Sequence, residues 1–174
     1  MSNILINGRT AVHAKSGGTV NSPDVCKTPP YGSPSTFTNV ASSSDAAGTA
    51  STVFINGQPA CHMDSTFAVS QGDEGGSYGG TTSGTHMGPA EFITGSSNVF
   101  IEGKPAVRQG DLMVSNNRNT PPTPLQQSGG NPPKALQASD IDAQTLADAA
   151  ESLPADNGNT ERLLSGPEVR GDDQ

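Results

Sequence analysis

Three histidines and two cysteines are the side chains of this 174-residue sequence best suited to binding a metal ion. His13 and His62 occupy the same place in two copies of a repeated stretch, five residues beyond a glycine. Cys26 and His86 are each followed, three residues later, by a proline, which suggests that they too are equivalent. Imidazole and thiolate donors in a closed set of four favour tetrahedral Zn²⁺. The sequence therefore predicts a structural zinc site.

The same residues also fit an interpretation without a metal, in which they are scattered through surface and core. Their spacing matches none of the compact Cys-x₂-Cys signatures of zinc sites. Cys61 falls in the repeat position that holds Val12 and Val107, so we expect a small buried hydrophobe there rather than a ligand. A nucleophilic dyad of Cys26 or Cys61 with a histidine would need an activated thiol, and nothing in the sequence marks one. A disulfide between the two cysteines is not expected where thiols are kept reduced.

The candidate ligands are positioned by a stretch that occurs three times, at residues 4–13, 53–62 and 99–108. The copies start 49 and 46 residues apart (53 − 4 and 99 − 53), which is typical of a structural repeat. In each copy an apolar run leads into Asn-Gly or Glu-Gly and a short returning run, the pattern of a tight β-hairpin. A single hairpin is marginal in water, so the repeat predicts an all-β domain of three hairpins around a pseudo-threefold axis.

These motifs resemble those of PAAR-repeat proteins over roughly residues 1–116. The resemblance is carried by Phe54-Ile55-Asn56-Gly57-Gln58-Pro59-Ala60 and by its copy from Phe100 to Asp111, preceded by Gly95-Ser96-Ser97-Asn98-Val99. The PAAR-like branch is the closer match, as indicated by Ser22-Pro23-Asp24-Val25-Cys26-Lys27-Thr28-Pro29. The sequence departs from the family in containing no literal Pro-Ala-Ala-Arg.

The resemblance implies a small all-β cone on the blunt end of the trimeric VgrG-type spike of a type VI secretion system, or of a related contractile injection machine. The three repeats further predict that one copy caps each trimer, with the apolar hairpin positions Phe54, Ile55, Phe100 and Ile101 or their neighbours on the docking face. In the family, three histidines and one cysteine bind zinc near the apex. Carried over to this sequence, the ligands would be His13, Cys26, His62 and His86.

The remaining segments are predicted to be loops, linker and tail. Prolines such as Pro23 and Pro34 favour an ordered surface loop over residues 16–35. Six glycines favour a flexible loop over residues 71–84, in which Asp73 and Glu74 would be solvated. Residues 1–116 would form the domain, residues 117–138 a linker rich in Pro, Gly and Asn, and residues 139–174 a mostly unstructured acidic tail with one helix from Ser139 to Leu153.

Composition excludes several classes of function. The formal charge of −8 and the absence of a basic stripe argue against a nucleic-acid partner. No apolar run of membrane-spanning length and no signal peptide is present, so we expect synthesis in the cytoplasm and export by the secretion machine. A structural spike tip without enzyme activity explains the repeats best. The alternatives are a small metal-dependent effector or toxin enzyme delivered by the same machine, and a tail that acts as cargo or adaptor.

Overall fold

The computed structural model describes residues 2–130, and within them the three predicted hairpins are present. They are β1–β2 (Leu5–Ile6 and Arg9–Thr10), β6–β7 (Phe54–Ile55 and Gln58–Pro59) and β11–β12 (Phe100–Ile101 and Lys104–Pro105). Both residues of each turn have positive φ, including Asn7 at 53°, Asn56 at 52° and Glu102 at 51°. This is the turn geometry that Asn-Gly predicts.

The strands that leave the hairpins are joined in a closed cycle. His13 forms a β-bridge with Ala60, His62 with Ala106, and Arg108 with Ala11. One residue further along each copy, a backbone N–H donates to the neighbouring copy: Ala14 to Pro59 (3.0 Å), Met63 to Pro105 (2.9 Å) and Gln109 to Thr10 (2.8 Å). Equivalent residues therefore make equivalent contacts, which confirms the pseudo-threefold arrangement.

A long antiparallel hairpin follows the first repeat. It consists of β3 (Thr19–Thr28) and β4 (Ser33–Ser42), and β9 (Ser70–Gln71) adds a third strand beside β4. The prediction of a loop here was wrong, because both prolines occupy places where no ladder N–H is needed. Pro23 lies on β3, the edge strand of this sheet, and Pro34 lies on β4 beyond the two residues, Val40 and Ala41, that pair with β9.

A five-stranded sheet in the order β14-β13-β10-β8-β5 completes the fold. Its strands are β5 (Ala46–Ala47), β8 (Thr66–Phe67), β10 (Ala90–Phe92), β13 (Leu112–Val114) and β14 (Thr123–Pro124). A single 3₁₀ turn, η1 (Ser43–Asp45), precedes β5. Residues 117–130, predicted to be linker, belong to this packed unit, since β14 pairs with β13 and Leu125 is buried.

Two apolar clusters hold these elements together. The larger contains Val12, Cys61 and Val107, one from each repeat, packed with residues of the five-stranded sheet such as Phe67 and with Leu125, which follows β14. The smaller lies under the hairpins and contains the repeat-related alanines and isoleucines, among them Ala11, Ala60, Ala106, Ile55 and Ile101. The full burial of Cys61 beside the two valines agrees with its predicted role as a small hydrophobe.

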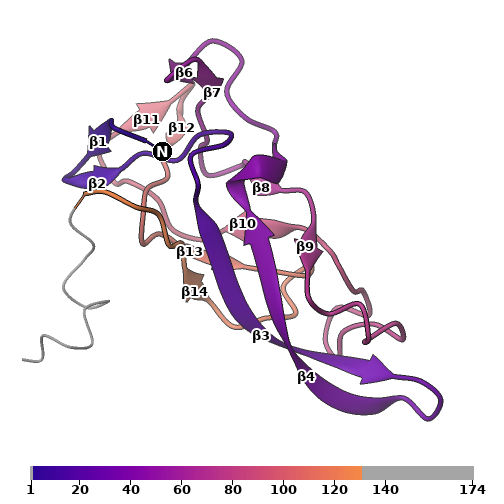
Figure 1. The fold of residues 1–174 in the computed structure, drawn as a ribbon. Helices are drawn as coiled ribbons and strands as arrows, with labels where there is room; N and C mark the ends of the chain where they lie inside the picture. Colours follow the sequence, from indigo (N-terminus) through magenta and orange to yellow (C-terminus); the bar gives the residue numbers. More distant parts are fainter. Residues whose placement is uncertain (1, 131–174) are drawn as a thin grey trace, which may run out of the picture. The chain divides into compact units, whose positions relative to one another are not determined.

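The three hairpins gather at one end of residues 2–130, and the β3–β4 hairpin runs to the other (Figure 1). The all-β prediction is thereby confirmed. No helix of the described residues is long and apolar enough to cross a membrane. The helix predicted from Ser139 to Leu153 lies outside the described residues, as does all of the predicted tail.

Candidate functional site

His13 and His62, two of the four predicted zinc ligands, lie in the ring formed by the hairpins. Both are buried. His13 Nδ1 lies 2.7 Å from the carbonyl oxygen of Ala14, and His13 Nε2 has no partner. His62 Nδ1 lies 3.3 Å from the N–H of Asp64, so it is an acceptor, and burial lowers the pKa of His62. In each histidine, Nδ1 therefore contacts a backbone group one or two residues further along the chain.

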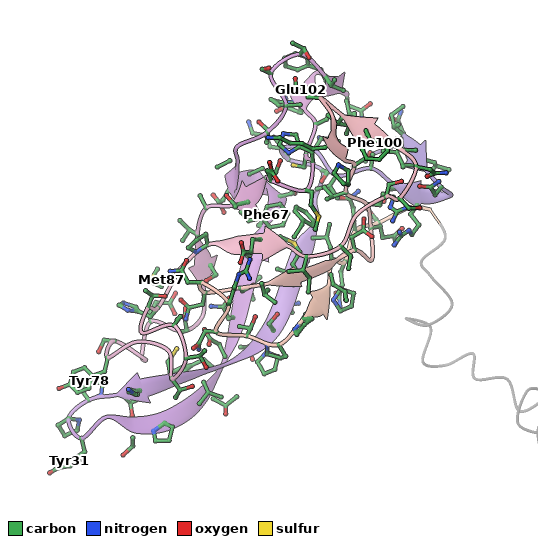
Figure 2. All side chains as sticks on the ribbon, turned by 180° about the vertical axis from the view of Figure 1, so that it is seen from behind. Tyr31, Phe67, Tyr78, Met87, Phe100 and Glu102 are labelled. Atoms are coloured by element: carbon green, nitrogen blue, oxygen red, sulfur yellow. The ribbon has the colours of Figure 1, made fainter. Side chains whose placement is uncertain are left out.

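Cys26 and His86 belong to the opposite part of the fold. Cys26 lies on β3, is buried, and forms a β-bridge with Gly80 of the glycine-rich loop. His86 is exposed and precedes Met87, which Figure 2 places between the hairpins and the far turn at Tyr31. Within residues 2–130 no group of three or more potential ligand atoms combines these four side chains. A zinc site made of His13, Cys26, His62 and His86 stays a prediction that this geometry does not assemble.

The structure instead brings Cys26 together with two carboxylates that the sequence did not mark as ligands. Asp24 and Cys26 are two residues apart on β3 and therefore share a face, and Asp73 reaches them from the loop after β9. One ligand atom from each lies within 4.8 Å of the others, and all three residues are fully buried. The prediction that Asp73 is solvated was wrong, whereas Glu74 is exposed as expected.

Asparagine side chains donate hydrogen bonds to the carboxylate of Asp24 but not to that of Asp73. Asp24 Oδ2 accepts hydrogen bonds from Asn116 Nδ2 (2.8 Å) and Asn39 Nδ2 (3.3 Å), and Asp24 Oδ1 accepts one from Asn119 Nδ2. Asp73 Oδ2 accepts from the N–H of Met87 (2.8 Å), while Asp73 Oδ1 has no partner. Nothing local in the sequence signals this environment, because its amide donors come from residues far along the chain.

Glycines let the loop approach this cluster closely. A Cβ at Gly76 would lie 2.2 Å from the Cβ of Cys26, and one at Gly80 would lie 2.3 Å from the side chain of Asn119. Both glycines are buried. The stretch predicted as a flexible loop is thus, at these two positions, packed against β3 and the 116–119 segment.

Neither thiol has the surroundings of a nucleophile. Burial, and then the charges of Asp24 and Asp73, raise the pKa of Cys26 to about 12. Burial raises the pKa of Cys61 to about 12 as well. Burial also raises the pKa of Asp73. A catalytic cysteine needs the opposite, an electropositive and partly exposed setting that favours the thiolate.

Comparison with known proteins agrees with this fold. The model of the Toxin PAAR-like domain matches residues 17–122, which is more than half of the chain. The chain belongs to this family. A relative from Escherichia coli called "Cysteine protease effector 1" is 36% identical over 100 residues, which are 57% of this chain and 20% of the relative. The chain thus spans about a fifth of that relative's length. No solved structure matches.

Membership in the PAAR-like family implies association with the VgrG-type spike of a type VI secretion system and export with it. PAAR proteins bind zinc, and the donors that this PAAR-like chain gathers are the thiol and carboxylates of Cys26, Asp24 and Asp73. This set fits a divalent ion, because carboxylate oxygen and thiolate sulfur are both ligands that Zn²⁺ accepts. It differs from the Cys-His₃ set expected from the resemblance.

The end of the PAAR-like domain that carries the hairpins exposes apolar side chains at equivalent positions. Leu5, Phe54 and Phe100 each lie three residues before the turn glycine and are 56%, 58% and 57% exposed. The following residues, Ile55 and Ile101, are buried in the smaller cluster. Of the residues predicted to line a docking face, the two phenylalanines are therefore available and the two isoleucines are not.

Proposed function

We propose that residues 2–130 cap the trimeric VgrG-type spike of a type VI secretion system, with one copy per trimer. The observation that carries the proposal is the cyclic pairing of the three repeats, in which His13, His62 and Arg108 bridge Ala60, Ala106 and Ala11. A trimer ends in three equal chains, so a single chain can contact all of them alike only if it offers three similar sites. The cyclic repeat supplies such sites.

Exposed apolar surface supports the same proposal. Leu5, Phe54 and Phe100 each leave more than half of a large apolar side chain in water. A set of such residues at one end of a fold is typical of an interaction surface, since burial of each contributes about 1.5–3 kcal/mol. Their nearly equal exposure is what three quasi-equivalent contacts require.

The name of the Escherichia coli relative favours a second candidate, in which this chain is part of an effector. We propose that the described residues are a delivery module without enzyme activity, because both of their cysteines are buried with pKa values raised to about 12. Cargo or an adaptor function would then belong to the tail or to a separate protein.

Size-exclusion chromatography with light scattering tests the cap directly. The full chain mixed with its cognate spike should elute as one cap with three spike chains. Phe54→Ser combined with Phe100→Ser should abolish the complex, whereas Tyr31→Ser, an exposed aromatic at the far turn, should leave it intact. Three caps per trimer, or a complex sensitive only to Tyr31→Ser, would contradict the proposal.

A further inference from the structure

We propose that the end of residues 2–130 opposite the hairpins binds a neutral polysaccharide, whose sugar rings stack on Tyr31 and Tyr78. This distal surface consists of residues 27–34, where β3 turns into β4, and residues 77–84 of the loop after β9. Figure 2 shows both tyrosines at this end and Phe100 at the other. The spike contact proposed above uses the hairpin end, so binding at the distal surface does not depend on it.

The distal surface leaves two aromatic rings in water. Tyr31 is 91% exposed and Tyr78 is 54% exposed. They are the only two tyrosines of the chain, which has no tryptophan. A phenol ring has an apolar face and a polar tip, and such side chains are enriched where proteins bind their partners. Two of them at one end of a fold therefore indicate a binding surface.

Backbone hydrogen bonds join the two segments that carry the rings. The N–H of Tyr78 donates to the carbonyl of Lys27 (3.1 Å), and the N–H of Lys27 donates to the carbonyl of Gly79 (2.8 Å). Within the turn, the N–H of Gly32 donates to the carbonyl of Thr28 (2.8 Å). A Cβ built on Gly32 would lie 3.8 Å from Tyr78 Cδ2, so this ring lies against the turn. A ring held in this way loses little conformational entropy when a ligand binds.

The other side chains of the distal surface decide which class of ligand it fits. Lys27 is the only charged residue of residues 27–34 and 77–84, which contain no Val, Leu, Ile, Met or Phe. A phosphate-bearing or acidic ligand would call for several cations. Insertion into lipid would call for leucine, phenylalanine or tryptophan, and the core of a protein interface would call for more apolar side chains.

Hydroxyl groups surround the two rings instead. Four exposed residues of the distal surface carry them, namely Ser33, Ser77, Thr81 and Thr82. Their side-chain oxygens form no hydrogen bond within residues 2–130. A hydroxyl both donates and accepts, so these groups are free to bond a ligand that is itself rich in hydroxyls.

A pyranose with equatorial hydroxyls matches this arrangement. Its ring faces consist of C–H bonds, which are weakly positive and pack on the negative face of an aromatic ring. Its hydroxyls point outward from the ring edge, where serine and threonine hydroxyls can bond them. A neutral chain of such sugars needs no counterion, and the distal surface offers almost none. The class of ligand is therefore a β-linked polysaccharide of glucose or N-acetylglucosamine.

Tyrosine fluorescence tests the proposal directly, because Tyr31 and Tyr78 are the only tyrosines and no tryptophan masks them. The full chain is titrated with two probes, the β-linked hexamers of N-acetylglucosamine and of glucose. At least one hexamer should change the fluorescence to saturation. Absence of a change with both would overturn the proposal and leave the spike contact untouched.

Variants locate the binding on the rings. Tyr31→Ser and Tyr78→Ser should each weaken binding of the hexamer about fivefold or more, with the remaining tyrosine as reporter. Tyr31→Phe keeps the ring and should bind nearly as tightly as the wild type. Val69→Ser removes an exposed apolar side chain outside the distal surface and should have no effect. Unchanged affinity in both tyrosine-to-serine variants would overturn the proposal.

A membrane surface is the competing partner, since tyrosine also collects at membrane–water interfaces. Sedimentation with neutral phosphatidylcholine vesicles separates the two. The wild-type chain should stay in the supernatant. Pelleting that is lost in Tyr31→Ser combined with Tyr78→Ser would overturn the proposal in favour of lipid. Both side chains are exposed, so these substitutions should leave the fold intact.

Discussion

Glu102 Oε1 accepts hydrogen bonds from both the backbone N–H and the hydroxyl of Thr52, each at 2.7 Å. Two further bonds come from Ser51. Glu102 occupies the turn position that asparagine holds in the other two hairpins, and Asn7 makes the corresponding link, donating from Nδ2 to Asn98 Oδ1 at 3.0 Å. The turn of one hairpin thus fastens the segment that leads into another.

Acid should weaken this link at Glu102. Its hydrogen bonds lower the pKa of the Glu102 carboxyl from 4.5 to about 2. Because the pKa is lower in the folded state, the stabilisation is complete above about pH 4.5 and is lost as the pH falls toward about 2. The difference in melting temperature between wild type and Glu102→Gln should therefore be largest near pH 6 and shrink below pH 4.5, as followed by circular dichroism. A difference that does not change with pH would contradict this assignment.

The two cysteines should respond differently to the same substitution. Cys61→Val places a valine where the other repeats already have Val12 and Val107, so the free energy of unfolding should change by less than about 1.5 kcal/mol. Cys26→Val places branched carbon against Gly76 and the two carboxylates and should cost more, about 1–3 kcal/mol. Urea unfolding measures both. A larger loss for Cys61→Val would mean that the repeat positions were aligned wrongly.

The structural features that the sequence predicted correctly are those that depend on residues close together in the chain or on the repeat. The hairpins were found because each turn lies within a stretch of ten residues that recurs along the chain. Cys61 was placed correctly because Val12 and Val107 share its position in the repeat. The strands β3 and β4 were missed because prolines are tolerated at sheet edges, and edges are not visible before the partner strands are known.

The candidate site was predicted only in part, for a similar reason. Cys26 was singled out, but its neighbours Asp24 and Asp73 were not. Asp73 is buried only because the loop after β9 folds back onto β3. The hydrogen bonds to the carboxylate of Asp24 come from Asn116 and Asn119, more than ninety residues away. Periodicity and composition carry no information about such contacts.

The fold should tolerate removal of the chain after Gly130 but not after Asn116. Truncation at residue 116 deletes β14 and Leu125, whose side chain lies in the larger cluster. Loss of a buried leucine side chain alone costs about 2–5 kcal/mol, and Leu125→Ala should show a loss in that range. Thermal unfolding of the two truncated chains compares them directly. Equal melting temperatures would show that residues 117–130 are a linker after all.

A methyl group at Gly76 should disturb the fold more than one at Gly84. Alanine at Gly76 would meet the Cβ of Cys26 at 2.2 Å, and strand β3 holds that atom in place. Gly84 has a φ of +71° but nothing within 4 Å of an added Cβ, so alanine there should cost only the backbone strain of about 1–2 kcal/mol. Urea unfolding of both variants should rank them in this order, and the reverse order would argue against close packing of the loop on β3.

The three exposed apolar positions should contribute alike to binding of the spike. Leu5, Phe54 and Phe100 are equivalent in the repeat and nearly equal in exposure, so each meets a similar surface if the partner is a symmetric trimer. Replacing a well-buried interface anchor commonly costs more than 1 kcal/mol, which predicts that Leu5→Ser, Phe54→Ser and Phe100→Ser each weaken binding by about tenfold. Isothermal titration calorimetry with the cognate trimer gives the three affinities, and Tyr78→Ser, an exposed aromatic near the far turn, serves as the control. If one of the three substitutions abolished binding while the other two had no effect, the contacts would not be quasi-equivalent, and the repeat would have to serve the fold rather than the partner.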